Sequence, residues 1–176
     1  MEERIIEELK NSIRNIPDFP KEGILFRDIT TLLKDGRRFK DAVEIIAARY
    51  KEKRIDKVVG VEARGFIFAG VLAYKLNAGF VPVRKKGKLP AEVYELTYEL
   101  EYGSDTLQVH RDAITPQDRV LIVDDLLATG GTARAVCGLI GKFKAEIVGM
   151  EFLIELTDLK GREKLIGYPV SSIIEF

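Results

Sequence analysis

Apolar positions along the chain change spacing from segment to segment. Near the N-terminus they recur every three or four residues, which predicts amphipathic helices over residues 2–15 and 37–52. Further on, strands are predicted at 57–62, 79–84, 119–125, 146–154 and 170–175, with helices at 65–76 and 131–143. Apolar strands that alternate with helices are typical of a parallel sheet covered on both faces. The pattern predicts a single α/β domain over residues 1–176.

Residues 93–110 interrupt this alternation. From Val93 to Tyr102 the residues alternate strictly between two faces. One face carries Tyr94, Leu96, Tyr98, Leu100 and Tyr102, and the other carries Glu95, Thr97, Glu99 and Glu101. The sequence "GSD" then turns the chain into "TLQVH". We expect an antiparallel arm inserted into the α/β domain.

Composition narrows the class of protein. With 46% hydrophobic and 32% charged residues, the chain is typical of a globular domain. Lys+Arg and Asp+Glu both number 28, so no net positive charge favours a nucleic-acid partner. No apolar run approaches the roughly 18 residues that predict a membrane span. The single Cys137 excludes an internal disulfide and suits a reducing compartment, so we expect a cytoplasmic protein.

The stretch "VLIVDDLLATGGT", residues 120–132, has the features of an anion-binding loop. Ligands of open α/β sheets bind beyond the carboxyl ends of the strands, where this loop leads into a helix. The loop offers hydroxyl donors and a turn whose N–H groups can converge: Thr129, Gly130, Gly131 and Thr132. It lacks the lysine of a Walker A loop, which favours a monophosphate over a nucleoside triphosphate.

Asp124 and Asp125 directly precede this loop. Carboxylates repel a phosphate, but they accept hydrogen bonds from vicinal hydroxyls, directly or through a divalent cation. A phosphate at one end and a diol at the other describe a ribose 5-phosphate. A strand-end aspartate serving as a helix cap would explain one carboxylate and the glycines, but not the second carboxylate beside two threonines.

Cations that could bind further phosphates follow two other strands. Arg64 comes after strand 57–62, where its guanidinium could grip a pyrophosphate, although it could also be a surface arginine at a helix start. Lys85, Lys86 and Lys88 follow strand 79–84, and a charge run of this kind is usually solvated. Taken alone, Phe26 fits core packing better than an aromatic platform for a purine.

These motifs together resemble the type I phosphoribosyltransferase family. The likeness covers nearly the whole chain, in "PDFPKEGILFRDIT" (17–30), "EARGF" (62–66), "VRKKGKLP" (83–90), "VDDLLATGGT" (123–132), "LEYGSDTL" (100–107) and "ELTDLKGREKL" (155–165). The resemblance implies an open, mostly parallel sheet flanked by helices, an N-terminal hood over about residues 1–34 and a flexible catalytic arm over about residues 90–110. The last motif reads as a charged surface helix.

The resemblance also implies an activity and its partners. The expected reaction is Mg²⁺-dependent transfer of the 5-phosphoribosyl group from phosphoribosyl pyrophosphate to adenine, giving AMP and pyrophosphate in purine salvage by a homodimer. Mg²⁺ would be held mainly by substrate oxygens and water, with Asp124 and Asp125 as candidate protein ligands. A regulator that senses the same sugar phosphate, or an enzyme acting on another purine, is the alternative. The balanced charge and the intact "LEYG" arm speak against the regulator.

Site roles carried over from the family are as follows. The ribose and 5-phosphate would be held by Asp124, Asp125, Ala128, Thr129, Gly130, Gly131 and Thr132, and the pyrophosphate by Arg64, Lys85 and Lys88. Adenine would stack on Phe26 and be read by the main chain around Leu25 and Arg27. Glu101 would manage the proton and Tyr102 would help to close the arm. His110 and Cys137 receive no role.

Overall fold

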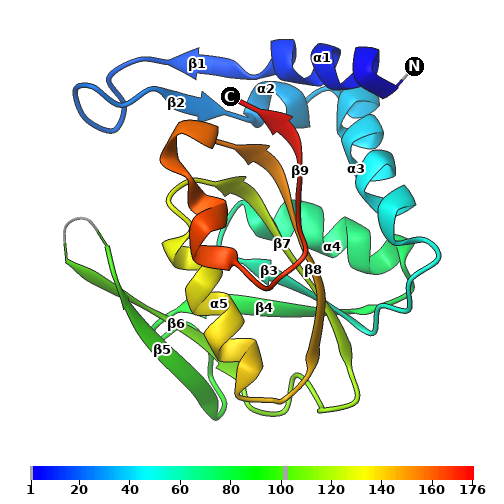
Figure 1. Cartoon of the computed structure of the whole chain (residues 1–176), viewed down its shortest axis with the longest axis vertical. Helices are drawn as coiled ribbons and strands as arrows, with labels where there is room; N and C mark the ends of the chain where they lie inside the picture. Colours follow the sequence, from blue (N-terminus) through cyan, green and yellow to red (C-terminus); the bar gives the residue numbers. More distant parts are fainter. Residues whose placement is uncertain (1, 101–102) are drawn as a thin grey trace.

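The computed structural model describes residues 2–100 and 103–176 and confirms the α/β class (Figure 1). The main sheet contains β3 (Lys57–Val61), β4 (Gly79–Lys85), β5 (Val93–Glu99), β6 (Ser104–His110), β7 (Arg119–Leu127), β8 (Glu146–Glu155) and β9 (Val170–Glu175). Its strand order is β5-β6-β4-β3-β7-β8-β9. The five strands from β4 to β9 in this order are parallel, and β5 and β6 join them antiparallel at one edge.

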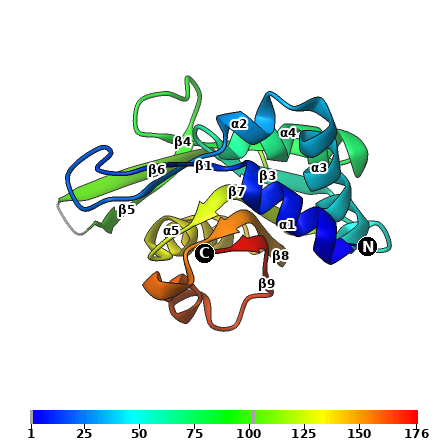
Figure 2. The same cartoon turned by 90° about the horizontal axis from the view of Figure 1, so that it is seen from above.

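Helices cover both faces of the sheet. Figure 2 shows α3 (Gly36–Tyr50) and α4 (Gly65–Lys75) on one side and α5 (Gly131–Gly141) on the other. Successive strand residues point to opposite faces, so Val58 packs toward α3 and α4 while Val59 packs toward α5. Both side chains are fully buried. This double burial explains why the parallel strands read as continuous apolar runs.

The N-terminal hood lies above the ends of the central strands (Figure 1). It comprises α1 (Glu2–Ser12), an antiparallel pair of β1 (Arg14–Ile16) with β2 (Phe26–Asp28), and α2 (Thr30–Leu33). The helix predicted over 2–15 is therefore too long by three residues. The Ser12 hydroxyl donates to the Leu9 carbonyl at its end, and Arg14 leaves the helix to pair with Asp28 across the strands.

The predicted antiparallel arm is present in the described residues. β5 and β6 pair from Val93 with His110 to Glu99 with Ser104. The apolar face of β5 lies against α5, where Tyr94 meets Phe143 edge to face with ring centres 5.1 Å apart. This packing fixes the base of the arm, and further along β5 the Tyr98 hydroxyl lies 3.1 Å from the Thr132 hydroxyl at the start of α5.

Candidate active site

Two adjacent carboxylates occupy the carboxyl-terminal part of β7. Asp125 is 5% exposed, and its backbone N–H donates to Asp124 Oδ1 at 2.8 Å. Burial raises the pKa of both carboxyl groups, and the charge of Asp125 raises the pKa of Asp124 further. Arg64 opposes the rise in the pKa of Asp125. The pair therefore resists carrying two negative charges unless cations or donors approach it.

Arg64 supplies one such cation from the first turn after β3. Its Nε lies 2.8 Å from Asp125 Oδ2, the distance of an ion pair. The angles are not those of a hydrogen bond, so this buried oxygen accepts none from the residues that the structure describes. Gly65 makes the approach possible, because a Cβ at this position would lie 2.7 Å from Asp124 Oδ1. Asp125 Oδ2 thus remains an acceptor for a hydroxyl of a ligand.

The loop of residues 128–132, called the phosphate loop after its expected ligand, follows β7 and leads into α5. Gly130 caps the helix with φ +79°, a left-handed conformation that favours glycine. A Cβ there would lie 2.3 Å from the carbonyl oxygen of Gly161, so the loop and residues 157–165 are in close contact. The Thr132 hydroxyl lies 3.1 Å from the Tyr98 hydroxyl on the arm. Helix N-terminus, loop N–H groups and threonine hydroxyls together form a site suited to an anion.

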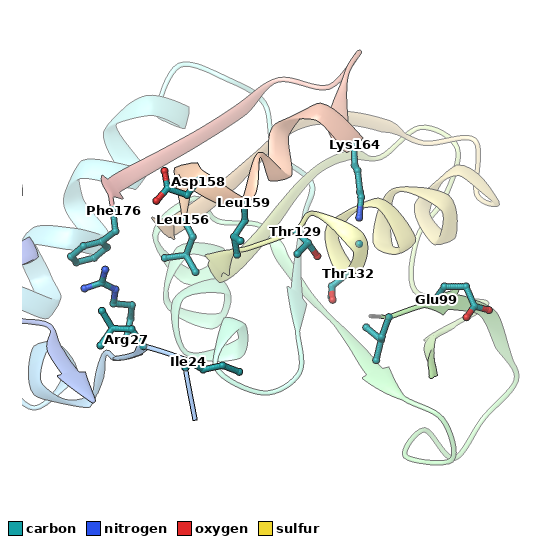
Figure 3. A pocket seen from close by; sticks show the side chains of 14 residues that line it. Ile24, Arg27, Glu99, Thr129, Thr132, Leu156, Asp158, Leu159, Lys164 and Phe176 are labelled. Atoms are coloured by element: carbon teal, nitrogen blue, oxygen red, sulfur yellow. The ribbon is translucent and has the colours of Figure 1, made fainter. Parts of the chain in front are cut away.

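A cavity of about 1120 Å³ extends from this loop to the hood (Figure 3). Its lining includes Gly23, Ile24, Leu25 and Arg27 of the hood, Glu99 and Leu100 of the arm, Thr129, Gly131 and Thr132 of the loop, and Leu156, Asp158, Leu159, Lys164 and Phe176. A second, smaller hollow joins Arg64, both carboxylates and the whole loop from Ala128 to Thr132. The structure thereby brings together most residues predicted from the sequence.

Phe26 is not among the described residues that line either hollow. Its ring meets Phe19 edge to face, with centres 5.1 Å apart, and the Arg64 guanidinium lies 5.2 Å from its centre. The residue is half-buried. One ring face is therefore near the cation expected to bind pyrophosphate.

The lysines after β4 are engaged by carboxylates. Lys88 Nζ lies 3.2 Å from Glu62 Oε1, beside the turn that carries Arg64. Lys85 Nζ lies 3.1 Å from Asp105 Oδ2 on β6, which raises the pKa of Lys85. Neither lysine is among the described residues that line the two hollows. Glu101 and Tyr102 lie outside the described residues.

Several wall residues were missed by the sequence analysis. The surface helix expected near residue 160 is instead two short 3-10 helices, η1 (Thr157–Leu159) and η2 (Gly161–Leu165), whose Gly161 and Leu165 are buried. Lys160 between them adopts φ +52°, which ends a continuous helix.

The sequence analysis also missed Phe176, because only the tertiary structure brings it to the hood.

The sequence analysis also missed Asp28, which orders the hood segment expected to bind the base. It accepts hydrogen bonds from the Arg14 side chain and from the N–H and hydroxyl of Thr30 at 2.9 and 2.7 Å. These bonds, that of the Thr30 hydroxyl first, lower the pKa of Asp28 to about 2. The Asp28 carboxylate, one residue after Arg27, thus connects β2 to both β1 and α2.

Within residues 2–100 and 103–176, no three His, Cys, Asp or Glu side chains converge as a metal-binding group. In the same part of the chain, none of the helices has the length and apolar character needed to cross a bilayer.

Comparison with known proteins defines the class. The family described as "Phosphoribosyl transferase domain" matches residues 29–174, so the chain belongs to the phosphoribosyltransferase family. An adenine phosphoribosyltransferase of Halothermothrix orenii is 58% identical over 168 residues, which are 96% of this chain and 99% of that protein. Within the family, the chain groups with the adenine phosphoribosyltransferases.

Solved structures agree with this assignment. The adenine phosphoribosyltransferase of Thermoanaerobacter pseudethanolicus has a TM-score of 0.94 at 51% identity, covering 97% of this chain and 99% of that one. The enzyme of Saccharomyces cerevisiae has a TM-score of 0.91 at 40% identity, covering 97% and 99% of the two chains. That structure was solved with adenine and an imino-altritol bisphosphate.

Proposed function

We propose that the chain transfers the 5-phosphoribosyl group of phosphoribosyl pyrophosphate to N9 of adenine, giving AMP and pyrophosphate in purine salvage. One observation carries this proposal: Asp124 and Asp125 line a single hollow together with the loop from Ala128 to Thr132 and with Arg64, which forms an ion pair with Asp125 at 2.8 Å. This combination of carboxylates, anion-binding loop and arginine matches the diol, 5-phosphate and pyrophosphate of that substrate.

The sugar phosphate would bind along the carboxyl end of β7. Residues 128–132 surround the 5-phosphate with N–H and hydroxyl donors. Asp124 and Asp125 accept hydrogen bonds from the ribose hydroxyls. Because burial raises their pKa, hydroxyl donors stabilise the charged form and favour binding of the sugar.

The pyrophosphate would lie beside Arg64. A guanidinium binds phosphate oxygens in a bidentate way, and Arg64 would exchange part of its interaction with Asp125 for them. Lys88 is close to the same turn through Glu62, whereas Lys85 must leave Asp105 to take part. Both lysines remain proposed ligands.

The carboxylate oxygens of this site suit Mg²⁺, which prefers oxygen ligands and usually keeps several waters. Asp124 and Asp125 would contribute to its binding together with substrate oxygens, since Asp125 Oδ2 accepts no hydrogen bond from the residues that the structure describes. When bound, Mg²⁺ would neutralise part of the pyrophosphate charge.

Adenine would bind under the hood. Phe26 would stack on the purine, and main-chain groups around Leu25 and Arg27 would pair with N1 and N6. A 6-oxopurine presents the opposite donor and acceptor pattern, so buried groups would be left unpaired and binding would weaken strongly.

The bond to pyrophosphate breaks as the bond from N9 to the anomeric carbon forms, through an oxocarbenium-like state. Protein groups act mainly by positioning and by stabilising charge. Glu101 is the proposed acceptor of the proton released by adenine, and Tyr102 the proposed closing residue. Glu99 and Leu100 already line the cavity, which supports this role for the arm.

The enzyme would act in the cytoplasm as a homodimer. Exposed apolar side chains on α4 and the adjoining end of β4 support an interface there, with Ile67 39%, Tyr74 87% and Phe80 41% exposed. Analytical ultracentrifugation of the unmodified chain and of Tyr74→Glu tests it, since the charge should shift a dimer to monomer.

The activity is tested with purified protein, phosphoribosyl pyrophosphate and each purine base in turn, with nucleotide product separated and measured. We expect AMP from adenine, at rates far above those with hypoxanthine or guanine, and loss of product on chelation of Mg²⁺. Comparable turnover of hypoxanthine would contradict the proposed base site, and product formation in EDTA would contradict the role of the metal.

A further inference from the structure

We propose that Lys164 binds the 5-phosphate and supplies the cation that the phosphate loop itself lacks. This inference rests on the proposed function, because it assigns a partner to the same 5-phosphate. The sequence motif of the loop contains no lysine, and Lys164 comes from η2, more than thirty positions later in the printed sequence.

The position of the side chain is the first support. Lys164 lines the large cavity together with Thr129, Gly131 and Thr132. It also lines the neighbouring hollow that contains Gly131 and Tyr98. In Figure 3 its side chain extends from η2 toward Thr132, and the ammonium nitrogen is the part of the side chain nearest to Thr132.

The backbone that carries Lys164 is firmly mounted on the loop. A Cβ at Gly161 would lie 2.3 Å from the carbonyl oxygen of Ala128, so the two segments touch without room for a side chain. Leu165, directly after the lysine, is 1% exposed. Arg162 anchors the same segment, since its Nε and Nη2 donate to the Glu155 carboxylate at 2.8 and 2.6 Å. The lysine therefore projects from a fixed base.

The charge of Lys164 is available to a ligand. Among residues 2–100 and 103–176, no carboxylate forms an ion pair with it and no acceptor takes a hydrogen bond from it, whereas Arg162 in the same turn is paired with Glu155. The side chain is exposed toward the cavity. A dianionic phosphate in the loop would give this ammonium a charge-assisted hydrogen bond.

A solvated surface lysine is the competing interpretation, and the 5-phosphate distinguishes the two. AMP and adenosine differ only in that group, so a direct contact with the phosphate affects one ligand and spares the other. The experiment compares the unmodified protein with Lys164→Gln, Lys164→Arg and the control Lys142→Gln. Lys142 is an exposed lysine after α5 that lies outside the described lining of the site.

Titration calorimetry should show AMP binding to Lys164→Gln weakened by about ten- to a hundredfold, the range for one charged hydrogen bond, with adenosine affinity unchanged. Lys164→Arg should recover most of the affinity. Equal losses for AMP and adenosine, or an AMP affinity like that of Lys142→Gln, would overturn the proposal. Failure of the unmodified protein to bind AMP would instead overturn the proposed function on which it rests.

Phosphorus NMR provides a second readout that a purely structural role would not move. A nearby ammonium stabilises the dianion, so the pKa of bound AMP phosphate should lie below its usual value of about 6 in the unmodified protein and rise in Lys164→Gln. The same phosphate pKa in both proteins would overturn the contact.

Discussion

The Arg27 guanidinium lies 3.8 Å from the centre of the Phe176 ring, so the residue after β9 contacts the hood segment that is proposed to bind the base. Lys10 of α1 lies over the same ring at 5.0 Å. The carbonyl of Phe176 accepts hydrogen bonds from the N–H and hydroxyl of Thr157 at 2.9 and 2.8 Å. Hood, η1 and the end of β9 are thereby joined at one residue on the cavity wall.

Removing this ring should loosen the hood. Phe176→Ala loses a cation–π interaction of about 1 kcal/mol, which corresponds to a roughly fivefold rise in the KM for adenine, with the affinity for phosphoribosyl pyrophosphate unchanged. Phe176→Tyr keeps the ring and is the matched control. The test is steady-state kinetics with adenine as the varied substrate. An unaltered KM for adenine in Phe176→Ala would show that Arg27 does not depend on the Phe176 ring.

Phe26 should matter for adenine more than for the sugar. Phe26→Ala loses about 1–3 kcal/mol of stacking, an estimate taken from base stacking in nucleic-acid complexes, and should raise the KM for adenine. Phe19→Ala, which removes the ring that meets Phe26 edge to face, should have a smaller effect. If both variants keep the KM of the unmodified enzyme, Phe26 serves packing and the purine stacks elsewhere.

Glu101 is tested by its rate effect. Glu101→Gln should lower the single-turnover rate by about 10²–10⁴-fold, because general acid–base groups contribute that much, while substrate affinities stay similar. Single-turnover measurement is needed, since opening of the arm could limit kcat.

The matched control for this experiment is Glu95 rather than Glu99. The sequence alternation predicts that Glu99 shares the polar face with Glu101 two positions later, and from the sequence alone we would expect replacement of Glu99 to be silent. In the structure it lines the cavity, whereas Glu95 accepts a hydrogen bond from Gln108 at 2.8 Å outside it. Equal rates for Glu101→Gln and Glu95→Gln would remove the proton-handling role.

Glu151 of β8, whose buried side chain faces Arg49 and Tyr50 of α3, should make the stability of the protein depend on pH. Burial raises its pKa from the usual 4.5 to about 7, although Arg49 Nη1 lies 2.5 Å from Oε1 and the Tyr50 hydroxyl donates to Oε2 at 3.2 Å. The folded state then binds more protons than the unfolded state between these pH values. The free energy of unfolding should therefore fall as pH rises through this window, by at most about 3 kcal/mol at 1.36 kcal/mol per pKa unit.

Denaturant unfolding at pH 5 and pH 8 tests this pH dependence. Glu151→Gln should lose less stability than the unmodified protein between the two pH values. Glu146→Gln, on the same strand but exposed and paired with Arg119, should behave like the unmodified protein. Parallel losses in all three proteins would mean that Glu151 is not the titrating group.

The sequence predicts the sheet and the position of the loop at residues 128–132 well, because both are encoded locally. Consecutive apolar residues such as Val58 and Val59 indicate a strand that is buried on both faces. The residues from Asp124 to Thr132 form one continuous motif. The cavity proposed to bind the base could not be predicted in this way. Arg27, Leu159 and Phe176 come together only after folding, and no local periodicity in the sequence marks them. The hood strand at Arg14–Ile16 is too short to show a period of two, which explains the overlong helix prediction.

The most direct test of the account concerns the two carboxylates at the end of β7. The affinity of phosphoribosyl pyrophosphate with Mg²⁺ should be measured by calorimetry for Asp125→Asn and for the double variant with Asp124→Asn. Because burial raises the pKa of both groups, neutral side chains should leave the fold intact, which thermal melting checks.

Each lost charged hydrogen bond costs about 1.5–3 kcal/mol, so we expect affinity to fall about ten- to a hundredfold in Asp125→Asn and further in the double variant. Unchanged affinity in a folded double variant would show that the carboxylates do not hold the ribose.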